Sequence, residues 1–583
     1  MGKIWRVSGP LVIAEEMKGS QVYEVVEIGE DGIVGEIVGL EGDRAIIQAH
    51  EDTLGLKVGE LVAGTGRILS VELGPGLVGS IYDGLQKSLI ALGENIGPFI
   101  KRGVKAEPLP RDKKWQFTPE VKAGDSVSQG DILGVVPETE LIEHKIMVPV
   151  GLRGTVKEIR SGDYTVEEPI VWLDHNGETT ELTMMQKWPV RKPRPYKERF
   201  DPSGLLSTGM RIIDYMFPLA LGGKASIPGG FGTGKTVTLQ QLARWAQTHL
   251  NIYVGCGERG NEMADVLSSF RELKDPKTGR LLMEKEIFLA NTSNMPVVAR
   301  EASIFVGITM AEYFRDMGYD ILLVADSTSR WAEAMREMSG RLEEMPGEEG
   351  FPSYMGSRLS SFYERAGMVE CLGSPGRKGS VTVAGAVSPP GADFSEPVTQ
   401  NTLRIIDALF ALEVSLANKR HFPAISWLTS YSLYVDAVKD WWNEYDRGWE
   451  NTRASALKLL QQEAELEEIV RLVGPESLPE ADKLLLLVSR MIREDFLQQS
   501  AYHEVDTYCM PTKAGLMLKT IMKFYDLAQE MLDAGSGIES VRSSPMVYRI
   551  SRMKDIPNEV AEEKMNELWR EMEESMVAGK RVS

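Results

Sequence analysis

The fold class of this chain is decided by one stretch, Gly229-Gly230-Phe231-Gly232-Thr233-Gly234-Lys235-Thr236. It matches the P-loop (Walker A) pattern G-x-x-x-x-G-K-[ST], in which a glycine-rich turn aims backbone N–H groups at phosphate oxygens. Lys235 then reaches the β- and γ-phosphates, and the Thr236 hydroxyl coordinates Mg²⁺. A predicted strand at 224–228 and a predicted helix at 237–246 flank the stretch, so that phosphates would lie at a helix N-terminus. This context favours a nucleotide-binding α/β domain over a plain glycine turn.

The composition is that of a protein with several globular domains. The chain has 583 residues, of which 43% are hydrophobic and 26% charged. Its net charge of −20 argues against a protein that wraps nucleic acid. No apolar run approaches the roughly 18 residues of a membrane span and no signal sequence is evident, so we expect an intracellular protein. Cys256, Cys371 and Cys509 lie far apart without CxxC spacing, which predicts free buried thiols.

Hydrophobic periodicity divides the chain into segments. The first segment has short alternating runs separated by Gly and Asp, which is typical of a small β-barrel. After the insert described below, strand and helix patterns alternate as in a mostly parallel sheet. The last segment has apolar positions at helical spacing. The predicted domains are an N-terminal β-barrel (1–70), the start of the nucleotide-binding domain (71–112), a β-rich insert (113–185), the P-loop nucleotide-binding domain (186–435) and a C-terminal helical domain (436–583).

The insert at 113–185 resembles a biotinyl- or lipoyl-type barrel, because residues 121–134 and 148–159 look like its two halves. Lys145 could then serve as a carrier lysine. Carrier domains place that lysine in a tight hairpin, well before the second-half turn, whereas Lys145 follows His144 and precedes Pro149 by four residues. A structural β-insert is therefore the favoured interpretation.

Candidate catalytic residues follow the strands predicted after the P-loop, at 252–256, 286–291, 321–325, 381–387 and 424–428. In an open α/β sheet, ligand groups gather beyond the carboxyl ends of the strands. Asp326 could hold Mg²⁺ through water, although a carboxylate there could instead cap the next helix. Glu258 could polarise an attacking water, and Arg259 could hold that carboxylate or the phosphates. A surface ion pair is the alternative for Glu258 and Arg259.

Three aromatic residues could stack on an adenine ring, namely Phe231, Phe422 and Tyr502. Taken singly, each of them fits a core position better than a stacking role. The pattern of residues alone therefore does not choose among them.

Further motifs continue the P-loop signal through nearly the whole chain. They are Thr208-Gly-Met-Arg-Ile-Ile-Asp214, Gly255-Cys-Gly-Glu-Arg-Gly-Asn-Glu-Met263, Asn291-Thr-Ser-Asn-Met-Pro296, Asp326-Ser-Thr-Ser-Arg-Trp331, Ser395-Glu-Pro-Val-Thr-Gln-Asn401 and Arg420-His-Phe-Pro-Ala-Ile425. With these motifs the chain resembles the catalytic A subunits of V/A-type rotary ATPases and ATP synthases of archaea and bacteria. The insert resembles the extra domain that separates such A subunits from the β subunits of F-type enzymes.

The resemblance implies a multidomain fold with an N-terminal β-barrel, a bulge insert, an α/β P-loop domain with a mostly parallel sheet and a C-terminal helical domain. It also implies roles for individual residues. Lys235 and Thr236 bind phosphate and Mg²⁺, Glu258 activates water, Arg259 supports it and Asp326 serves Mg²⁺, while Phe422 and Tyr502 flank the adenine.

The resemblance implies partners as well: a B subunit in an alternating A3B3 ring that supplies an arginine finger, a rotor shaft, peripheral stalks and, indirectly, a membrane sector that moves protons or sodium ions. The expected location is the cytoplasmic face of a prokaryotic cell membrane. The alternatives are a structural subunit that binds nucleotide without catalysis, and a homohexameric P-loop ATPase of the export or Rho type. The net charge of −20 and the insert argue against an RNA translocase, so no nucleic acid is expected among the partners.

Overall fold

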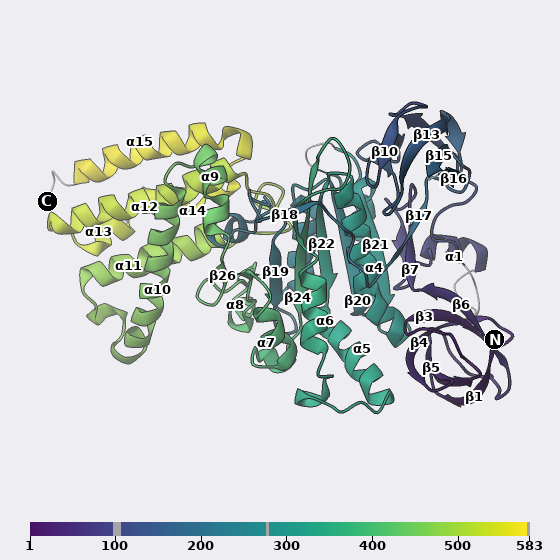
Figure 1. Cartoon of the computed structure of the whole chain (residues 1–583). Coiled ribbons are helices and arrows are strands. Elements are labelled where there is room, and N and C mark those ends of the chain that lie inside the picture. The colour runs from purple at the N-terminus through teal and green to yellow at the C-terminus, as the bar shows by residue number, and fades with distance from the viewer. Residues whose placement is uncertain (97–105, 176, 276–278, 580–583) are drawn as a thin grey trace. The chain divides into compact units, whose positions relative to one another are not determined.

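A computed structural model describes residues 1–96, 106–175, 177–275 and 279–579 of the chain (Figure 1). The chain forms two compact units, each built from several segments. The first unit comprises Met1–Asp201, Thr248–Val387 and Ser395–Ile405, and the second comprises Pro202–Gln247, Ser388–Phe394 and Ile406–Ser583. Among the described residues, no helix combines the length and the apolar composition that a membrane crossing requires.

The first unit begins with a closed six-stranded barrel in the order β1-β2-β5-β4-β3-β6. Alternate side chains of these strands are buried, and Val12, Val26, Ile28 and Ile47 fill the interior. The predicted N-terminal barrel is therefore confirmed. Its strands are β1 (Gly2–Ser8), β2 (Leu11–Glu15), β3 (Glu24–Ile28), β4 (Ile33–Glu41), β5 (Arg44–Ala49) and β6 (Leu61–Ile68).

The insert in the first unit consists of two four-stranded antiparallel sheets, ordered β10-β13-β15-β16 and β12-β11-β9-β14. Lys145 lies inside β12, not at a turn, and its ammonium donates to the Met317 carbonyl at 2.9 Å. This position fits the structural interpretation of the insert. Its strands are β9 (Trp115–Pro119), β10 (Ser126–Ser128), β11 (Ile132–Pro137), β12 (Glu143–Met147), β13 (Arg153–Ile159), β14 (Gly162–Tyr164), β15 (Val171–His175) and β16 (Glu178–Leu182).

A parallel sheet in the order β24-β22-β20-β21-β8 forms the core of the first unit. Its central strands are apolar and almost fully buried, as expected for a parallel sheet covered by helices. Helix α4 (Val297–Asp316) packs on these strands and is buried along most of its length. The strands are β8 (Ile81–Tyr82), β20 (Leu250–Glu258), β21 (Glu286–Thr292), β22 (Asp320–Asp326) and β24 (Lys378–Val387).

Shorter elements complete the first unit. Strand β7 pairs antiparallel with β17, and β23 pairs antiparallel with both β18 and β24. The elements are β7 (Ser70–Leu73), β17 (Gln186–Pro189), β18 (Glu198–Phe200), β23 (Gly367–Glu370), α1 (Leu89–Ile96), α3 (Gly260–Glu272), α5 (Thr328–Arg341), α6 (Met355–Tyr363) and α7 (Pro397–Leu403).

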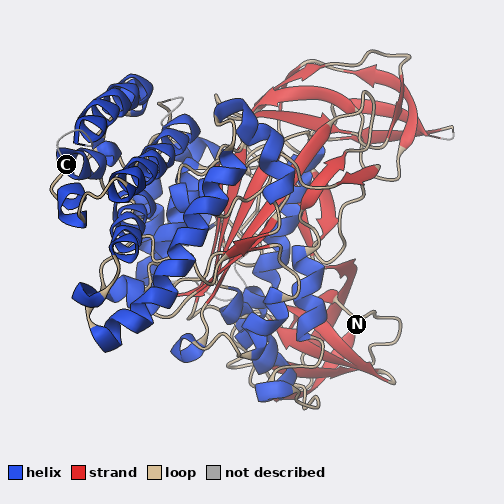
Figure 2. Ribbon diagram, turned by 90° about the vertical axis from the view of Figure 1, so that its left-hand side faces the viewer, coloured by secondary structure: helices blue, strands red, loops and turns tan. Residues whose placement is uncertain are grey.

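The second unit carries the P-loop and the C-terminal helices. Strand β19 (Lys224–Pro228) leads into the loop, and helix α2 (Lys235–Trp245) leaves it. Beside β19 lie β25 (Ala408–Leu409) and then β26 (Tyr431–Ser432). The predicted helical domain is confirmed, and Figure 2 shows its helices in blue. They are α9 (Val435–Tyr445), α10 (Trp449–Val473), α11 (Glu480–Met491), η6 (Ile492–Leu497), α12 (Pro511–Asp533), α13 (Ile538–Arg542), α14 (Pro545–Ser551) and α15 (Ala561–Gly579). The short helix α8 (Val414–Asn418) precedes them in the chain.

The prediction of a strand at 424–428 is wrong. Only an isolated bridge between Leu412 and Ile425 forms there. Pro423 has no N–H to give to a ladder. Beyond the bridge, the chain turns back, because the Ser430 N–H donates to the Ser426 carbonyl and the Ser430 hydroxyl accepts the Ala411 N–H, both at 3.0 Å. Side-chain and turn hydrogen bonds thus replace those of a strand.

Candidate functional site

The P-loop joins β19 to α2 through backbone conformations that glycine adopts most readily. Gly232 and Gly234 have φ values of 77° and 85°, in the left-handed region where a side chain would be strained. The first turn of α2, which starts at Lys235, leaves N–H groups without partners inside the helix. Such a helix N-terminus binds anions. The local sequence therefore builds a phosphate-sized receptor mostly from backbone.

Side chains hold this loop closed on itself. The ammonium of Lys235 donates to the carbonyls of Gly229 and Gly230 at 2.6 and 3.1 Å. The Thr233 hydroxyl also donates to the Gly230 carbonyl, at 2.8 Å. Lys235 therefore folds back over the P-loop. Phosphate oxygens that enter the loop would compete with the two carbonyls for the hydrogen bonds of its ammonium.

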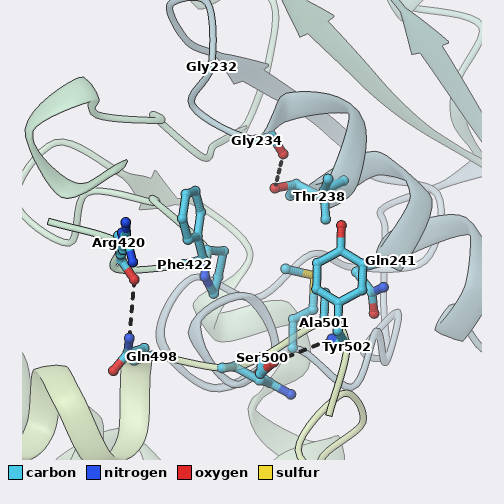
Figure 3. A pocket seen from close by; sticks show the side chains of 14 residues that line it. Gly232, Gly234, Thr238, Gln241, Arg420, Phe422, Gln498, Ser500, Ala501 and Tyr502 are labelled. Carbon is cyan, nitrogen blue, oxygen red and sulfur yellow. Dashed lines mark hydrogen bonds between the residues drawn. The ribbon is translucent and has the colours of Figure 1, made fainter. Parts of the chain in front are cut away.

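A cavity of about 370 Å³ lies beside the P-loop within the second unit (Figure 3). Gly232, Gly234 and Thr238 line it on the P-loop side, and Phe422 and Tyr502 stand on opposite sides of the space. Phe422 is 41% exposed and Tyr502 is 87% exposed, so neither side chain is enclosed by the packing around it. An apolar slot between two aromatic rings suits a flat heterocyclic base.

Phe231 behaves differently from the other two aromatic candidates. It is 85% exposed at the tip of the P-loop and is not among the residues that line the cavity. The structure thus brings Phe422 and Tyr502 to one cavity and leaves Phe231 outside it.

The predicted carboxylates lie in the first unit, at the carboxyl ends of two adjacent parallel strands. Strand β22 ends at Asp326, which pairs in register with Gly255 of β20, and β20 continues to Glu258. Asp326 is buried and accepts a hydrogen bond from the Tyr253 hydroxyl at 3.0 Å. The topology of the parallel sheet therefore gathers these acids at one edge, as the strand pattern predicts.

Glu258 has the perturbed acidity expected of a reactive group. Its pKa is raised from the usual value for a glutamic acid to about 7, first by burial and then by the negative charge of Asp326. Glu262 raises it as well, whereas the Arg330 guanidinium lowers it. A carboxyl poised near neutral pH can accept a proton from water at a useful rate.

Arg259 stands at the N-terminal end of α3, and its side chain is 66% exposed. Its guanidinium lies 3.7 Å from a carboxylate oxygen of Glu262, which is the surface ion pair left open by the sequence. The cation that acts on the acidity of Glu258 is Arg330, which is also anchored to Glu333 at 2.8 and 3.0 Å. Sequence reasoning missed Arg330, although it stands four residues after Asp326 in a motif already noted.

The predicted residues thus fall into two groups, one in each compact unit. The second unit holds the P-loop, Phe422 and Tyr502, and the first unit holds Glu258, Arg259 and Asp326. The P-loop, Phe422 and Tyr502 can bind a phosphorylated base through backbone N–H groups and aromatic faces. The residues of the first unit can orient and deprotonate water.

Comparison with known proteins accounts for nearly the whole chain. Four family models match it: the β-barrel domain of the ATP synthase alpha/beta family at 4–66, the barrel-sandwich domain of ATP synthase alpha/beta subunits at 106–191, the nucleotide-binding domain of the ATP synthase alpha/beta family at 209–432 and the C-terminal domain of V and A type ATP synthases at 439–542.

Full-length relatives agree with these matches. The chain is 63% identical to the A subunit of the A-type ATP synthase of Staphylothermus marinus, over 98% of this chain and 96% of the relative. It is 59% identical to the protein of the same name in Methanopyrus kandleri, over 98% and 97%. It is 55% identical to the V-type ATP synthase alpha chain of Acetivibrio thermocellus, over 99% and 98%. The chain belongs to the family of A-type ATP synthase A subunits, within the ATP synthase alpha/beta family.

Proposed function

We propose that this chain is the catalytic subunit of a V/A-type rotary ATPase, which hydrolyses or synthesises MgATP and couples this reaction to rotation and to transport of protons or sodium ions. The observation that carries the proposal is the P-loop beside a cavity walled by two aromatic rings in the second unit. Its family membership supports the same function. A homohexameric export-type or Rho-like ATPase is not favoured by relatives that match from end to end.

In the proposed binding mode the P-loop holds the phosphates and the aromatic cavity holds the base. Lys235 exchanges its bonds to the loop carbonyls for bonds to the β- and γ-phosphates, which are charge-assisted and therefore stronger. Phe422 and Tyr502 stack on the two faces of adenine. Binding thus depends on groups that lie in the second unit alone.

Each of the two proposed metal residues offers an oxygen donor of the kind that Mg²⁺ takes. Thr236 supplies a hydroxyl in the first turn of α2, and Asp326 supplies a buried carboxylate oriented by the Tyr253 hydroxyl. Mg²⁺ prefers such hard oxygen ligands, with waters and substrate phosphates in its remaining positions. When bound, the ion offsets the negative charge of the phosphates.

Glu258 is the proposed base of the reaction. Its carboxylate orients the attacking water and accepts a proton from it, and its pKa of about 7 keeps it available near neutral pH. Arg330 favours the charged form of Glu258, and Arg259 supports the same region through its pairing with Glu262. In the synthesis direction the same groups act in reverse.

A complete site also needs groups from a neighbour. We propose an alternating ring of three such chains and three B subunits, in which each B subunit supplies an arginine finger to the transferred phosphoryl group. The rotor shaft and peripheral stalks join this ring, on the cytoplasmic face of the membrane, to the sector that moves ions. No nucleic acid takes part.

MgATP hydrolysis by the purified full-length chain, alone and after mixing with its B subunit, tests this proposal. We expect little turnover from the chain alone and a strong rise on mixing, because the arginine finger comes from the partner. Full activity of the chain alone as a homohexamer would contradict it and favour the export-type alternative.

A further inference from the structure

The motif Thr208-Gly-Met-Arg-Ile-Ile-Asp214 contains a buried arginine for which the proposed chemistry has no use. Arg211 is fully buried in the second unit, some distance along the chain from the P-loop. A guanidinium carries five N–H donors in a rigid planar fork, so a buried one fixes whatever accepts its bonds. The guanidinium of Arg211 donates to three acceptors within residues 496–506, and Cys509, just beyond them, also interacts with it.

The segment 496–506 is the one that carries Tyr502. The Nε of Arg211 donates to the Phe496 carbonyl at 2.6 Å, and one terminal nitrogen donates to the Gln498 carbonyl at 2.8 Å. The other terminal nitrogen donates to the Asp506 carboxylate at 2.6 Å. Arg211 therefore holds the segment 496–506 through hydrogen bonds on both sides of Tyr502.

Gln499 ties the same segment to the opposite wall of the cavity. Its backbone N–H donates to the Phe422 carbonyl at 2.9 Å, and its side-chain oxygen accepts the backbone N–H of Arg211 at 2.8 Å. Its side-chain nitrogen donates to the carbonyls of Gly209 and Asp506, both at 2.8 Å. Gln499 thus connects to the Phe422 wall through its backbone, and to Arg211 and Asp506 through its side chain.

The turn that presents Arg211 is itself closely determined. Gly209 has a φ of 69°, and a Cβ there would stand 2.1 Å from the Tyr508 ring, so only glycine fits. Asp214 accepts the backbone N–H groups of Thr208 and Gly209 at 2.8–2.9 Å. Residues 208–214 therefore form a rigid base for the segment that bears Tyr502.

We propose that Arg211 is a positioning residue for the nucleotide base: it holds the segment 496–506 so that Tyr502 faces Phe422 across the cavity. Tyr502 is 87% exposed, so the packing around its own ring does little to hold it. A preorganised aromatic wall avoids the entropy cost of ordering a side chain when the ligand binds. This inference rests on the proposed function and adds a residue to its binding site.

A merely structural ion pair would behave differently from a positioning residue, and a double-mutant cycle separates the two. The variants are Arg211→Lys, Tyr502→Ala and their combination in the full-length chain, and the readout is the Kd of a fluorescent ATP analogue in the presence of Mg²⁺. Lysine keeps the charge but cannot reach all three acceptors of Arg211. We expect Arg211→Lys to weaken binding by about 2- to 10-fold, and to have no further effect once Tyr502 is alanine.

Two further variants supply a matched control and a second, independent test. Arg453→Lys is the matched control, because Arg453 is a half-buried arginine of the second unit that, like Arg211, donates from Nε to a backbone carbonyl, that of Met216, at 2.6 Å. We expect it to leave the Kd unchanged. Gln499→Ala removes the side-chain hydrogen bonds to Arg211, Gly209 and Asp506 while keeping the Arg211–Asp506 pair. It should weaken binding in the same direction as Arg211→Lys, so the test survives if Arg211→Lys fails to fold.

Three outcomes would overturn the inference. An unchanged Kd in both Arg211→Lys and Gln499→Ala would show that the segment does not position the base. Additive losses in the double variant would show that Arg211 acts independently of Tyr502. Failure of the wild-type chain to bind the analogue would remove the proposed function itself, and with it this inference.

Discussion

The P-loop region of the second unit and the carboxylate edge of the first unit are built in contrasting ways. The P-loop region presents backbone N–H groups from one short stretch of sequence, together with two exposed aromatic rings from distant parts of the chain. The carboxylate edge consists of acidic side chains at strand ends, and the pKa of Glu258 there is set by burial and by charged neighbours on β22, α3 and α5. Binding a phosphate requires only a backbone shape, whereas activating water requires a tuned pKa. The account therefore assigns nucleotide affinity to the first of these regions and chemistry to the second.

The largest expected effect that tests this contrast comes from replacing Lys235. Its replacement by alanine removes the cation that folds back over the P-loop. We expect MgATP turnover of the assembled complex to fall by at least about 100-fold, together with a clear loss of nucleotide affinity. Turnover and equilibrium binding measured on the same preparation would check this. Unchanged binding would contradict a role for Lys235 in holding the phosphates.

The aromatic walls should affect affinity without affecting chemistry. Loss of one stacking partner costs about 1–3 kcal/mol, so Phe422→Ala or Tyr502→Ala should raise the KM for MgATP roughly 5- to 150-fold, with kcat nearly unchanged. Phe231→Ala is the matched control, because Phe231 lies outside the cavity, and it should leave KM as it is. A fall in kcat with unchanged KM for either wall variant would be inconsistent with stacking.

The sequence allows the P-loop region to be predicted more completely than the carboxylate edge. Its glycines and Lys235 are adjacent in the chain, so one motif predicts both the loop and the helix that follows. Phe422 and Tyr502 were chosen only through the family resemblance, because no local pattern shows that residues 80 positions apart line one cavity. Their roles, like those of Glu258, Arg259 and Asp326, remain predictions.

Other features depend on contacts that no local pattern reveals. The pKa of Glu258 is raised first by burial and then by the charge of Asp326, which lies near it because β22 pairs with β20. The role of Arg211 depends on acceptors about 290 residues away. The strand predicted at 424–428 failed because Ser426 and Ser430 form turn hydrogen bonds there. The barrel, the buried thiols and the helical C-terminal domain were predicted correctly, since each follows from regional composition and periodicity.

The smallest expected effect concerns pH and sharpens the description of the carboxylate edge. Because the base must be ionised and the pKa of Glu258 is raised to about 7, kcat/KM should fall as the pH drops below about 7. Glu262→Gln removes a negative neighbour that raises this pKa, so the acidic limb should move to lower pH. The measurement is kcat/KM between pH 5.5 and 9 for both proteins. A kcat/KM that stays constant down to pH 5.5 would contradict a raised pKa of Glu258 in the working enzyme.

The central claim, that binding and chemistry are assigned to different regions, is tested most directly by Glu258→Gln in the complex assembled with the B subunit. The substitution keeps the size of the side chain and removes its ability to accept a proton. The account predicts that MgATP binds with an affinity close to that of the wild type while turnover falls by about 10²- to 10⁴-fold. Unchanged turnover would remove Glu258 from the mechanism, and a loss of binding as large as the loss of turnover would contradict the assignment of affinity to the P-loop region.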